Sequence, residues 1–155
     1  MVGERYGIFR VIAASRHAVL LGEASAGDVD GLAAQATALV AAGARAALVK
    51  GGHMPGNTLS DVLLLADGSE HVFTDARIDT RNTHGTGCTL SAAIAAHLAL
   101  GADMLRAVQR GRDYVRNALT AGAKACIGHG HGPVNHGFDP QPMHTRPLSG
   151  VAAHE

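Results

Sequence analysis

A glycine-rich turn that contains a cysteine is the stretch of this chain best suited to chemistry. Residues 82–91 read Asn-Thr-His-Gly-Thr-Gly-Cys-Thr-Leu-Ser, and an apolar helical run begins at Leu90. Gly85 and Gly87 allow a tight turn and a close approach of the backbone to a ligand. Because the turn leads into a helix, its unpaired N–H groups and the positive end of the helix dipole predict a site for a phosphate or a developing alkoxide.

The thiol of Cys88 is expected at the mouth of this turn. A helix N-terminus favours the thiolate form of a cysteine, so a reactive Cys88 is one interpretation. The other is an ordinary glycine turn before a core helix, with Cys88 buried and inert, because short glycine motifs are weak signals. Cys126 lies near a helix end among alanine and isoleucine, and we expect it to be structural.

Elements of alternating type are expected around the turn. Asp67-Gly68 is a strong hairpin signal between two apolar runs. The helix after the glycine turn has an alanine-rich face that would permit close contact with a sheet. The order of elements predicts an α/β layer structure with a mixed sheet. The expected elements are apolar runs at 8–14 and 18–21, strands at 45–50, 62–65 and 71–73, a helix from Asp28 or Asp30 to about Ala42 that stops at Gly43, a helix over 87–100, and a helix capped by Asp103 with Leu105, Val108, Val115 and Leu119 on one face.

Composition narrows the class of protein. The 155 residues are 46% hydrophobic, which is enough for the core of one domain, and only 3% aromatic. A net charge of +0 argues against nucleic-acid and membrane-surface partners. The sequence shows no run long enough for a membrane span and no signal-peptide pattern. Two cysteines cannot form a disulfide framework in a chain of this length, so we expect a cytoplasmic, reducing setting.

Three motifs in order closely resemble the C-terminal half of hydroxymethylpyrimidine/phosphomethylpyrimidine kinases, members of the ribokinase-like superfamily. The motifs are Lys50-Gly51-Gly52-His53 after an apolar strand, Gly85-Thr86-Gly87-Cys88, and Gly128-His129-Gly130-His131-Gly132-Pro133. The resemblance covers roughly residues 20–138, with helices of fitting length between the motifs. A cysteine at position 88, where the superfamily usually has an aspartate, marks the pyrimidine kinases. The implied fold is the C-terminal part of a ribokinase-like layered α/β/α sheet.

The resemblance implies an ATP- and Mg²⁺-dependent kinase of thiamine biosynthesis with a small-molecule substrate. The family phosphorylates hydroxymethylpyrimidine and then its monophosphate. The amides of residues 85–88 would hold the oxygen that becomes negative. Cys88 would stand where the acceptor hydroxyl is activated, as a thiolate that accepts a proton or as a thiol that donates a hydrogen bond.

The resemblance also places Lys50 beside the nucleotide phosphates. The lysine would act there as a point charge, and Gly51 and Gly52 would allow close approach. The alternative for Lys50 is a solvated side chain at the end of a strand.

The start of the chain departs from the family pattern. Family members carry roughly another half upstream, with most of the pyrimidine pocket, and an Asn-x-x-Glu motif that supports magnesium. Its positions correspond here to Ala13 and Arg16, which cannot do that work. We therefore divide the chain into an unmatched or altered start (1–19), a partial kinase domain (20–138) and a flexible tail (139–155). The alternative function is a non-catalytic nucleotide-binding or interaction remnant, and either a homo-oligomer or a partner that supplies the missing half is expected.

Ten histidines raise the question of a metal site. His129, His131 and His136 lie in one loop, and alternate-residue spacing can chelate an ion. No matching pair of cysteines accompanies them, and the segment belongs to the kinase resemblance. We therefore expect no dedicated metal site.

Overall fold

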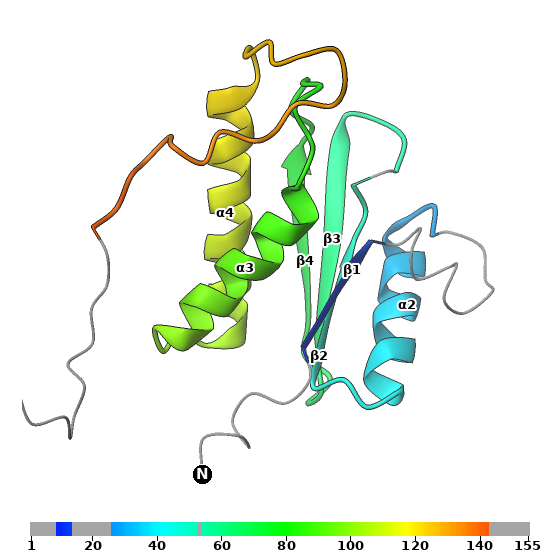
Figure 1. Ribbon diagram of the computed structural model, residues 1–155. Coiled ribbons are helices and arrows are strands. Elements are labelled where there is room, and N and C mark those ends of the chain that lie inside the picture. Colours follow the sequence, from blue (N-terminus) through cyan, green and yellow to red (C-terminus); the bar gives the residue numbers. More distant parts are fainter. Residues whose placement is uncertain (1–8, 14–25, 53, 143–155) are drawn as a thin grey trace, which may run out of the picture.

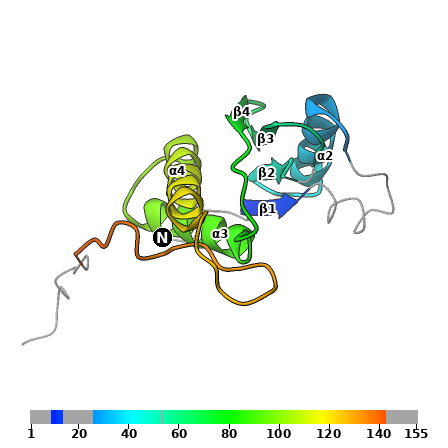
Figure 2. The same cartoon turned by 90° about the horizontal axis from the view of Figure 1, so that it is seen from above.

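In the computed structural model, residues 9–13, 26–52 and 54–142 are described. Their strands form one sheet in the order β1-β2-β3-β4, with α2 on one face and α3 and α4 on the other (Figures 1 and 2). The layered α/β architecture expected from the sequence is confirmed. The elements are β1 (Phe9–Ala13), α2 (Val29–Ala41), β2 (Ala46–Lys50), β3 (Thr58–Leu65), β4 (Glu70–Ala76), α3 (Thr86–Ala99) and α4 (Met104–Gly122).

The sheet is mixed, as predicted. β1 pairs with β2 in parallel, whereas β2, β3 and β4 pair antiparallel in turn. β2 therefore lies inside the sheet, which confirms the strand expected at residues 45–50. The hairpin at Asp67-Gly68 is also confirmed, and Gly68 has a φ of +87°. Its strands are longer than predicted because the pairing continues to Thr58 opposite Ala76.

Both faces of β2 are buried, which explains its continuous apolar run. Ala47 and Val49 pack against α2, and Ala46 and Leu48 pack against α3 and α4. β3 alternates in the same way, because successive side chains point to opposite faces. The cluster on the α2 face comprises Leu32, Ala36, Leu39, Ala47, Val49, Val62 and Leu64, and the cluster on the other face comprises Ala46, Leu48, Leu63, Leu90, Ile94, Ala107, Val108 and Val115.

The predicted helix caps are present. The side chain of Asp28 accepts a hydrogen bond from the Gly31 amide at 2.8 Å, and that of Asp103 accepts one from the Arg106 amide at 2.8 Å. Gly43 follows α2 with a φ of +98°, a conformation that favours glycine at a helix end. Among the helices that the structure describes, none combines the length and apolar character of a membrane span.

Three packing expectations were wrong. The alanines of α3 do not mediate close contact with the sheet, because α3 reaches the sheet through Leu90 and Ile94. Close helix contact comes instead from Gly111 of α4, where a Cβ atom would lie 2.8 Å from Cγ1 of Ile94. Leu105 is 37% exposed, since it lies roughly a quarter turn from the buried stripe of α4. Cys126 is exposed because α4 ends at Gly122 and the chain continues as a loop. The exposed or partly exposed alanines of α3 are Ala92, Ala93, Ala95, Ala96 and Ala99.

Some sequence expectations concern residues outside the described ranges. These are the apolar run at 18–21, the position of Arg16, His53, most of the start at 1–19 and the tail from residue 143 onward.

Candidate functional site

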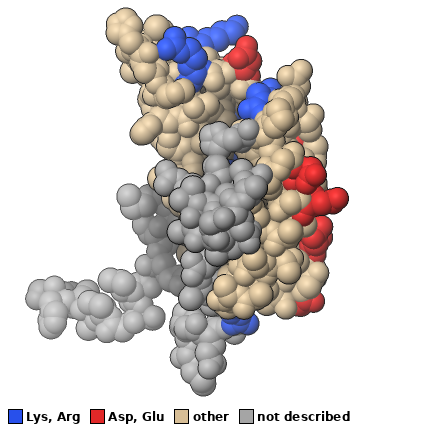
Figure 3. All heavy atoms as spheres, turned by 90° about the vertical axis from the view of Figure 1, so that its right-hand side faces the viewer, with Lys and Arg blue, Asp and Glu red and all other residues tan. Residues whose placement is uncertain are grey.

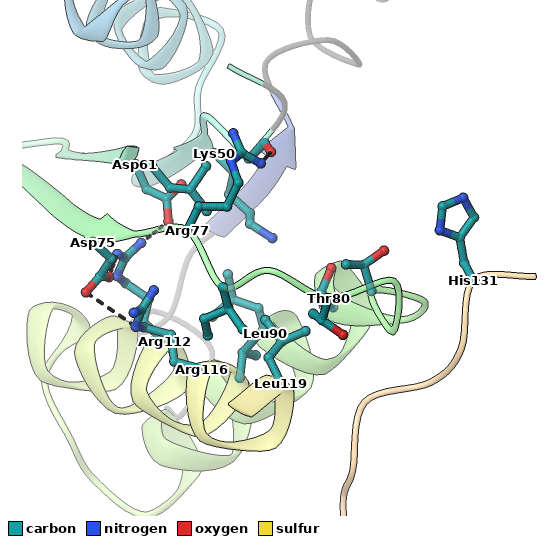
Figure 4. Close-up of a pocket in the computed structure, with 16 residues that line it drawn as sticks. Lys50, Asp61, Asp75, Arg77, Thr80, Leu90, Arg112, Arg116, Leu119 and His131 are labelled. Carbon is teal, nitrogen blue, oxygen red and sulfur yellow. Dashed lines mark hydrogen bonds and ion pairs between the residues drawn. The ribbon is translucent and has the colours of Figure 1, made fainter. Parts of the chain in front are cut away.

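A pocket of about 550 Å³ lies at the end of the sheet where β2 ends and β3 begins (Figure 4). This volume is within the range of small-molecule sites. The pocket opens on the face of the sheet that α3 and α4 cover, and His131 lies apart from the other labelled residues. The lining residues are Lys50, Gly52, Leu59, Asp61, Asp75, Arg77, Ile78, Thr80, Thr83, Thr86, Leu90, Arg112, Val115, Arg116, Leu119 and His131.

Lys50, the last residue of β2, lines the pocket as an unpaired cation. Its ammonium makes no hydrogen bond or ion pair with any residue in the described ranges. Burial first, and the charge of Arg112 second, lower the pKa of Lys50 from its ordinary value of 10.5. A bound anion would offset both the cost of burying the ammonium and its repulsion by Arg112. Lys50 is therefore partly buried in the pocket rather than fully solvated at the end of the strand.

Hydrogen bonds to β3 hold the Gly51-Gly52 turn in place. The amide of Gly51 donates to the carbonyl of Ser60 at 2.9 Å and to Oδ1 of Asp61 at 3.1 Å. A side chain at Gly51 would collide with the Ser60 carbonyl and the sulfur of Met54, so only glycine fits. Gly52 lines the pocket with open space around the position of a Cβ atom. The backbone is therefore open to the pocket at Gly52, whereas Gly51 faces its neighbours and does not line the pocket.

Arg77 holds the same loop from its other end. Its guanidinium donates to three backbone carbonyls, those of Gly52 at 3.3 Å, Met54 at 2.5 Å and Gly56 at 2.9 Å. The loop between β2 and β3 is thus tied to the end of β4. Nothing in the sequence of residues 77–80 indicated this role.

The second glycine turn begins α3. Gly85 is the N-cap residue with a φ of +85°, and no side chain caps the helix. Within the described part of the chain, the amides of Gly87 and Cys88 have no hydrogen-bond acceptor. The N-terminus of α3 therefore has donors free for an anion, as the sequence predicted. Thr86 lines the pocket, whereas Gly85, Gly87 and Cys88 lie beside it and Cys88 is exposed.

Asn82 fixes this turn to the end of α4. Its buried side chain donates from Nδ2 to the carbonyls of Gly122 and Ala125, each at 2.7 Å. Gly132 packs against the Asn82 amide so tightly that a side chain there would collide with Oδ1. The His84 amide donates to the Gly132 carbonyl at 3.0 Å. The three motifs noted in the sequence therefore meet at one end of the sheet, the third as a support for the second.

Arg112 is the functional candidate that sequence reasoning missed. It projects from α4, 8% exposed, and ion-pairs through Nη1 with Oδ2 of Asp61 and through Nη2 with Oδ2 of Asp75 at 2.5 Å. Its guanidinium carbon lies 4.8 Å from the centre of the Phe73 ring. Arg116, one turn further on, pairs with Oδ1 of Asp75 at 3.4 Å.

Burial lowers the pKa of Arg112 to about 10, with Arg116 as the second cause and Asp113 opposing. Arg112 therefore stays charged at neutral pH. A signal for it existed in the sequence, because Arg112 falls four residues after Val108 and three before Val115, within the apolar stripe of α4. Asp61 likewise directly precedes the apolar residues of β3. A charged residue on a buried face needs a partner of opposite charge. Arg112 and Asp61 supply that partner to each other.

The charge of the pocket favours an anionic ligand. Four basic side chains line it, from Lys50, Arg77, Arg112 and Arg116, against the two carboxylates of Asp61 and Asp75. On the surface seen from the α2 side, most of the basic atoms lie toward the upper end of the molecule and most of the acidic atoms lower down (Figure 3).

The metal-ligating side chains of the described residues do not gather into a cluster. No group of three or more His, Cys, Asp or Glu side chains is placed to hold a metal in the described ranges. Both carboxylates of the pocket are occupied by arginine. The sequence has alanine, a residue type without a ligand atom, at position 13, which was matched to the magnesium-supporting motif.

Comparisons with known proteins identify a family for this chain. The sequence model of the family described as phosphomethylpyrimidine kinase matches residues 13–135. The hydroxymethylpyrimidine/phosphomethylpyrimidine kinase of Rhizobium meliloti (strain 1021) is 49% identical over 120 residues, which are 77% of this chain and 44% of that protein. The corresponding kinase of Streptomyces coelicolor is 46% identical over 112 residues, 72% of this chain and 40% of that protein. The chain thus spans less than half the length of these relatives.

Solved structures show the same fold. The structure of Bacillus subtilis pyridoxal kinase in complex with ADP matches 83% of this chain and 47% of that chain, with a TM-score of 0.75 and 28% identity. The phosphomethylpyrimidine kinase of Clostridium difficile 630 matches 72% of this chain and 42% of that chain, with a TM-score of 0.58 and 25% identity.

Proposed function

Because this chain belongs to the phosphomethylpyrimidine kinase family, we propose that it forms the nucleotide-binding part of an ATP-dependent kinase for hydroxymethylpyrimidine and its monophosphate. The observation that carries the proposal is the ammonium of Lys50, which has no partner among the described residues, in a pocket lined by more basic than acidic side chains. A partly buried cation without a partner is costly unless a ligand supplies the opposite charge. The triphosphate of ATP has that charge.

Phosphoryl transfer depends on positioning and on neutralising charge more than on covalent chemistry by the protein. ATP would supply the transferred group. Lys50 would bind phosphate oxygens, and Gly52 would let the backbone approach them. The unpaired amides of Gly87 and Cys88 would face the negative charge that develops during transfer. Mg²⁺ would arrive with the phosphates, since both carboxylates of the pocket are paired with arginine.

Cys88 is the proposed group that acts on the acceptor hydroxyl. Its thiol is exposed in the first turn of α3, beside the free amides. There it would accept the proton of the hydroxyl as a thiolate, or orient the hydroxyl through a hydrogen bond as a thiol. Thr83 and Thr86 line the adjoining pocket wall and offer further hydroxyl groups to the ligand.

The test is ATP affinity, measured by isothermal titration calorimetry. Lys50→Ala should weaken binding roughly 10- to 100-fold, the worth of one hydrogen bond to a charged group. Lys124→Ala is a matched control, because Lys124 is exposed and does not line the pocket. Absence of ATP binding by the unaltered chain would refute the proposal. Equal affinities of the unaltered chain and Lys50→Ala would remove Lys50 from the site.

A second candidate is a nucleotide-binding protein without kinase activity. It is favoured by the pairing of both pocket carboxylates with arginine and by alanine at position 13. The two functions are separated by measuring ADP formation from ATP and Mg²⁺ in the presence of hydroxymethylpyrimidine or its phosphate. ADP formation that depends on the pyrimidine supports the first function. Binding of ATP with no ADP formation supports the second function only when the partner that supplies the missing half is also present, because the first function assigns this chain the nucleotide-binding part alone.

A further inference from the structure

Asp61 joins the nucleotide-side turn to α4. Its Oδ1 accepts the Gly51 amide at 3.1 Å, and its Oδ2 accepts Nη1 of Arg112. The antiparallel register places Asp61 directly opposite Lys50. Asp61 and Arg112 are each 8% exposed, so water does not replace either bond easily. A displacement of Arg112 would therefore shift Asp61 and, through it, the backbone of Gly51, the residue that follows Lys50.

Arg112 is itself fixed in place. Its second terminal nitrogen is bonded to Asp75 on β4, and its guanidinium lies over the ring of Phe73. Asp75 is held in turn by Arg116, which also donates to the Ala76 carbonyl at 3.1 Å. The guanidinium thus bridges β3 and β4 with both terminal nitrogens, a geometry that suits arginine better than lysine.

We propose that Arg112 is a positioning residue that acts through Asp61 to hold the Gly51-Gly52 turn, and with it Lys50, in the geometry that binds the phosphates of the nucleotide. The identity of the ligand rests on the proposed function, whereas the mechanical link from Arg112 to Gly51 does not. The competing possibility is that Arg112 leaves its carboxylates and contacts phosphate directly.

The substitution Asp61→Asn separates these two possibilities. If Arg112 contacted phosphate directly, losing a nearby negative charge would leave ATP binding unchanged or make it tighter. If Arg112 acts through Asp61, binding should weaken. Asn has almost the same shape but only one acceptor oxygen, so it cannot accept from both the Gly51 amide and Nη1 of Arg112. The Ser60 carbonyl would still accept from the Gly51 amide, but one side chain would no longer join Gly51 to Arg112. One of the two donors would then face an NH₂ group, and the link would break.

The binding experiment compares ATP affinities of the unaltered chain, Asp61→Asn, Arg112→Met and the double variant. Each single variant should bind roughly 2- to 30-fold more weakly, the range found for residues that act through others. The double variant should be no weaker than the weaker single variant, because both changes break one link. Arg112→Lys should retain only part of the affinity. Arg110→Met is the charge-matched control on the exposed side of α4 and should bind as the unaltered chain does.

A second measurement needs no nucleotide. Hydrogen exchange of the Gly51 amide, followed by NMR, should be several-fold faster in Asp61→Asn and Arg112→Met. The amides of Leu48 and Leu63 in the sheet interior serve as an internal reference, since a general loss of stability would accelerate them equally. Unchanged Gly51 exchange, or ATP binding by Asp61→Asn as tight as that of the unaltered chain, would overturn the proposal. If the unaltered chain fails to bind ATP while Gly51 exchange responds as expected, the proposed function fails and the link stands.

Discussion

Replacing Asn82 by alanine tests how the second glycine turn is held in place. Asn82 is 5% exposed, and its Nδ2 donates to the carbonyls of both Gly122 and Ala125 at 2.7 Å. Alanine removes both donors without adding volume. The Gly122 carbonyl would still accept from the Ala125 amide at 3.0 Å, and the carbonyl of the exposed Ala125 can be hydrated.

The expected loss is therefore that of two hydrogen bonds without an orphaned carbonyl. Each contributes about 0.5–1.5 kcal/mol. Asn82→Ala should therefore lower the free energy of unfolding by about 1–3 kcal/mol, a substantial part of the roughly 5–15 kcal/mol typical of a domain. Urea unfolding followed by circular dichroism measures it. Asn117→Ala, on the exposed side of α4, is the matched control and should change stability little.

Coupling to Gly132 makes the prediction sharper. A Cβ atom at position 132 would collide with Oδ1 of Asn82 but would lie 3.5 Å from its Cβ, an ordinary contact. Gly132→Ala should therefore cost about 1–3 kcal/mol in the unaltered chain and clearly less when Asn82 is alanine. Gly130→Ala, in the same loop with open space around it, is the control. An equal cost of Gly132→Ala in both backgrounds would refute this account of the turn.

Two further predictions concern the chemistry of the site. Because burial lowers the pKa of Lys50 from 10.5, the charged form that binds phosphate is lost at a lower pH than for an exposed lysine. ATP affinity, measured by calorimetry across alkaline pH, should therefore fall as pH rises through this lowered pKa. Lys50→Arg should show no such fall, because the charge of arginine persists. Cys88→Ala should reduce turnover roughly 10²- to 10⁴-fold in any form that phosphorylates hydroxymethylpyrimidine, while ATP affinity stays the same because the amides of the turn remain. Cys126→Ala, also exposed but away from the pocket lining, should retain full turnover. Loss of ATP binding, or unchanged turnover, in Cys88→Ala would contradict its assigned role.

The sequence was most informative where local chemistry decides structure. The Asp28 and Asp103 caps, the Asp67-Gly68 hairpin and the buried strand at 45–50 are all present, because capping, turn conformation and apolar runs act over a few residues. The free amides of the α3 N-terminus were predictable for the same reason.

Contacts between distant residues were not predictable in this way. The pairing of Arg112 with Asp61 spans 51 positions, and the bonds of Arg77 to the β2–β3 loop depend on the fold as a whole. A pattern of apolar residues shows which face of α4 is buried, but not that a charge on that face has a partner on β3. The alanines of α3 were misjudged similarly, since the small residue that permits close packing, Gly111, is on the neighbouring helix.

The tie made by Asn82 also bears on the order in which the protein can fold. Each strand of the sheet pairs with its neighbour in sequence, so β1 to β4 can assemble as they leave the ribosome. The bond from Asn82 to Gly122 closes a separation of 40 residues, and its packing partner Gly132 lies further on. Closing so long a loop requires the later residues to be present and costs chain entropy. The sheet can thus form on a nascent chain in which the second glycine turn, at residues 85–88, is not yet held in place.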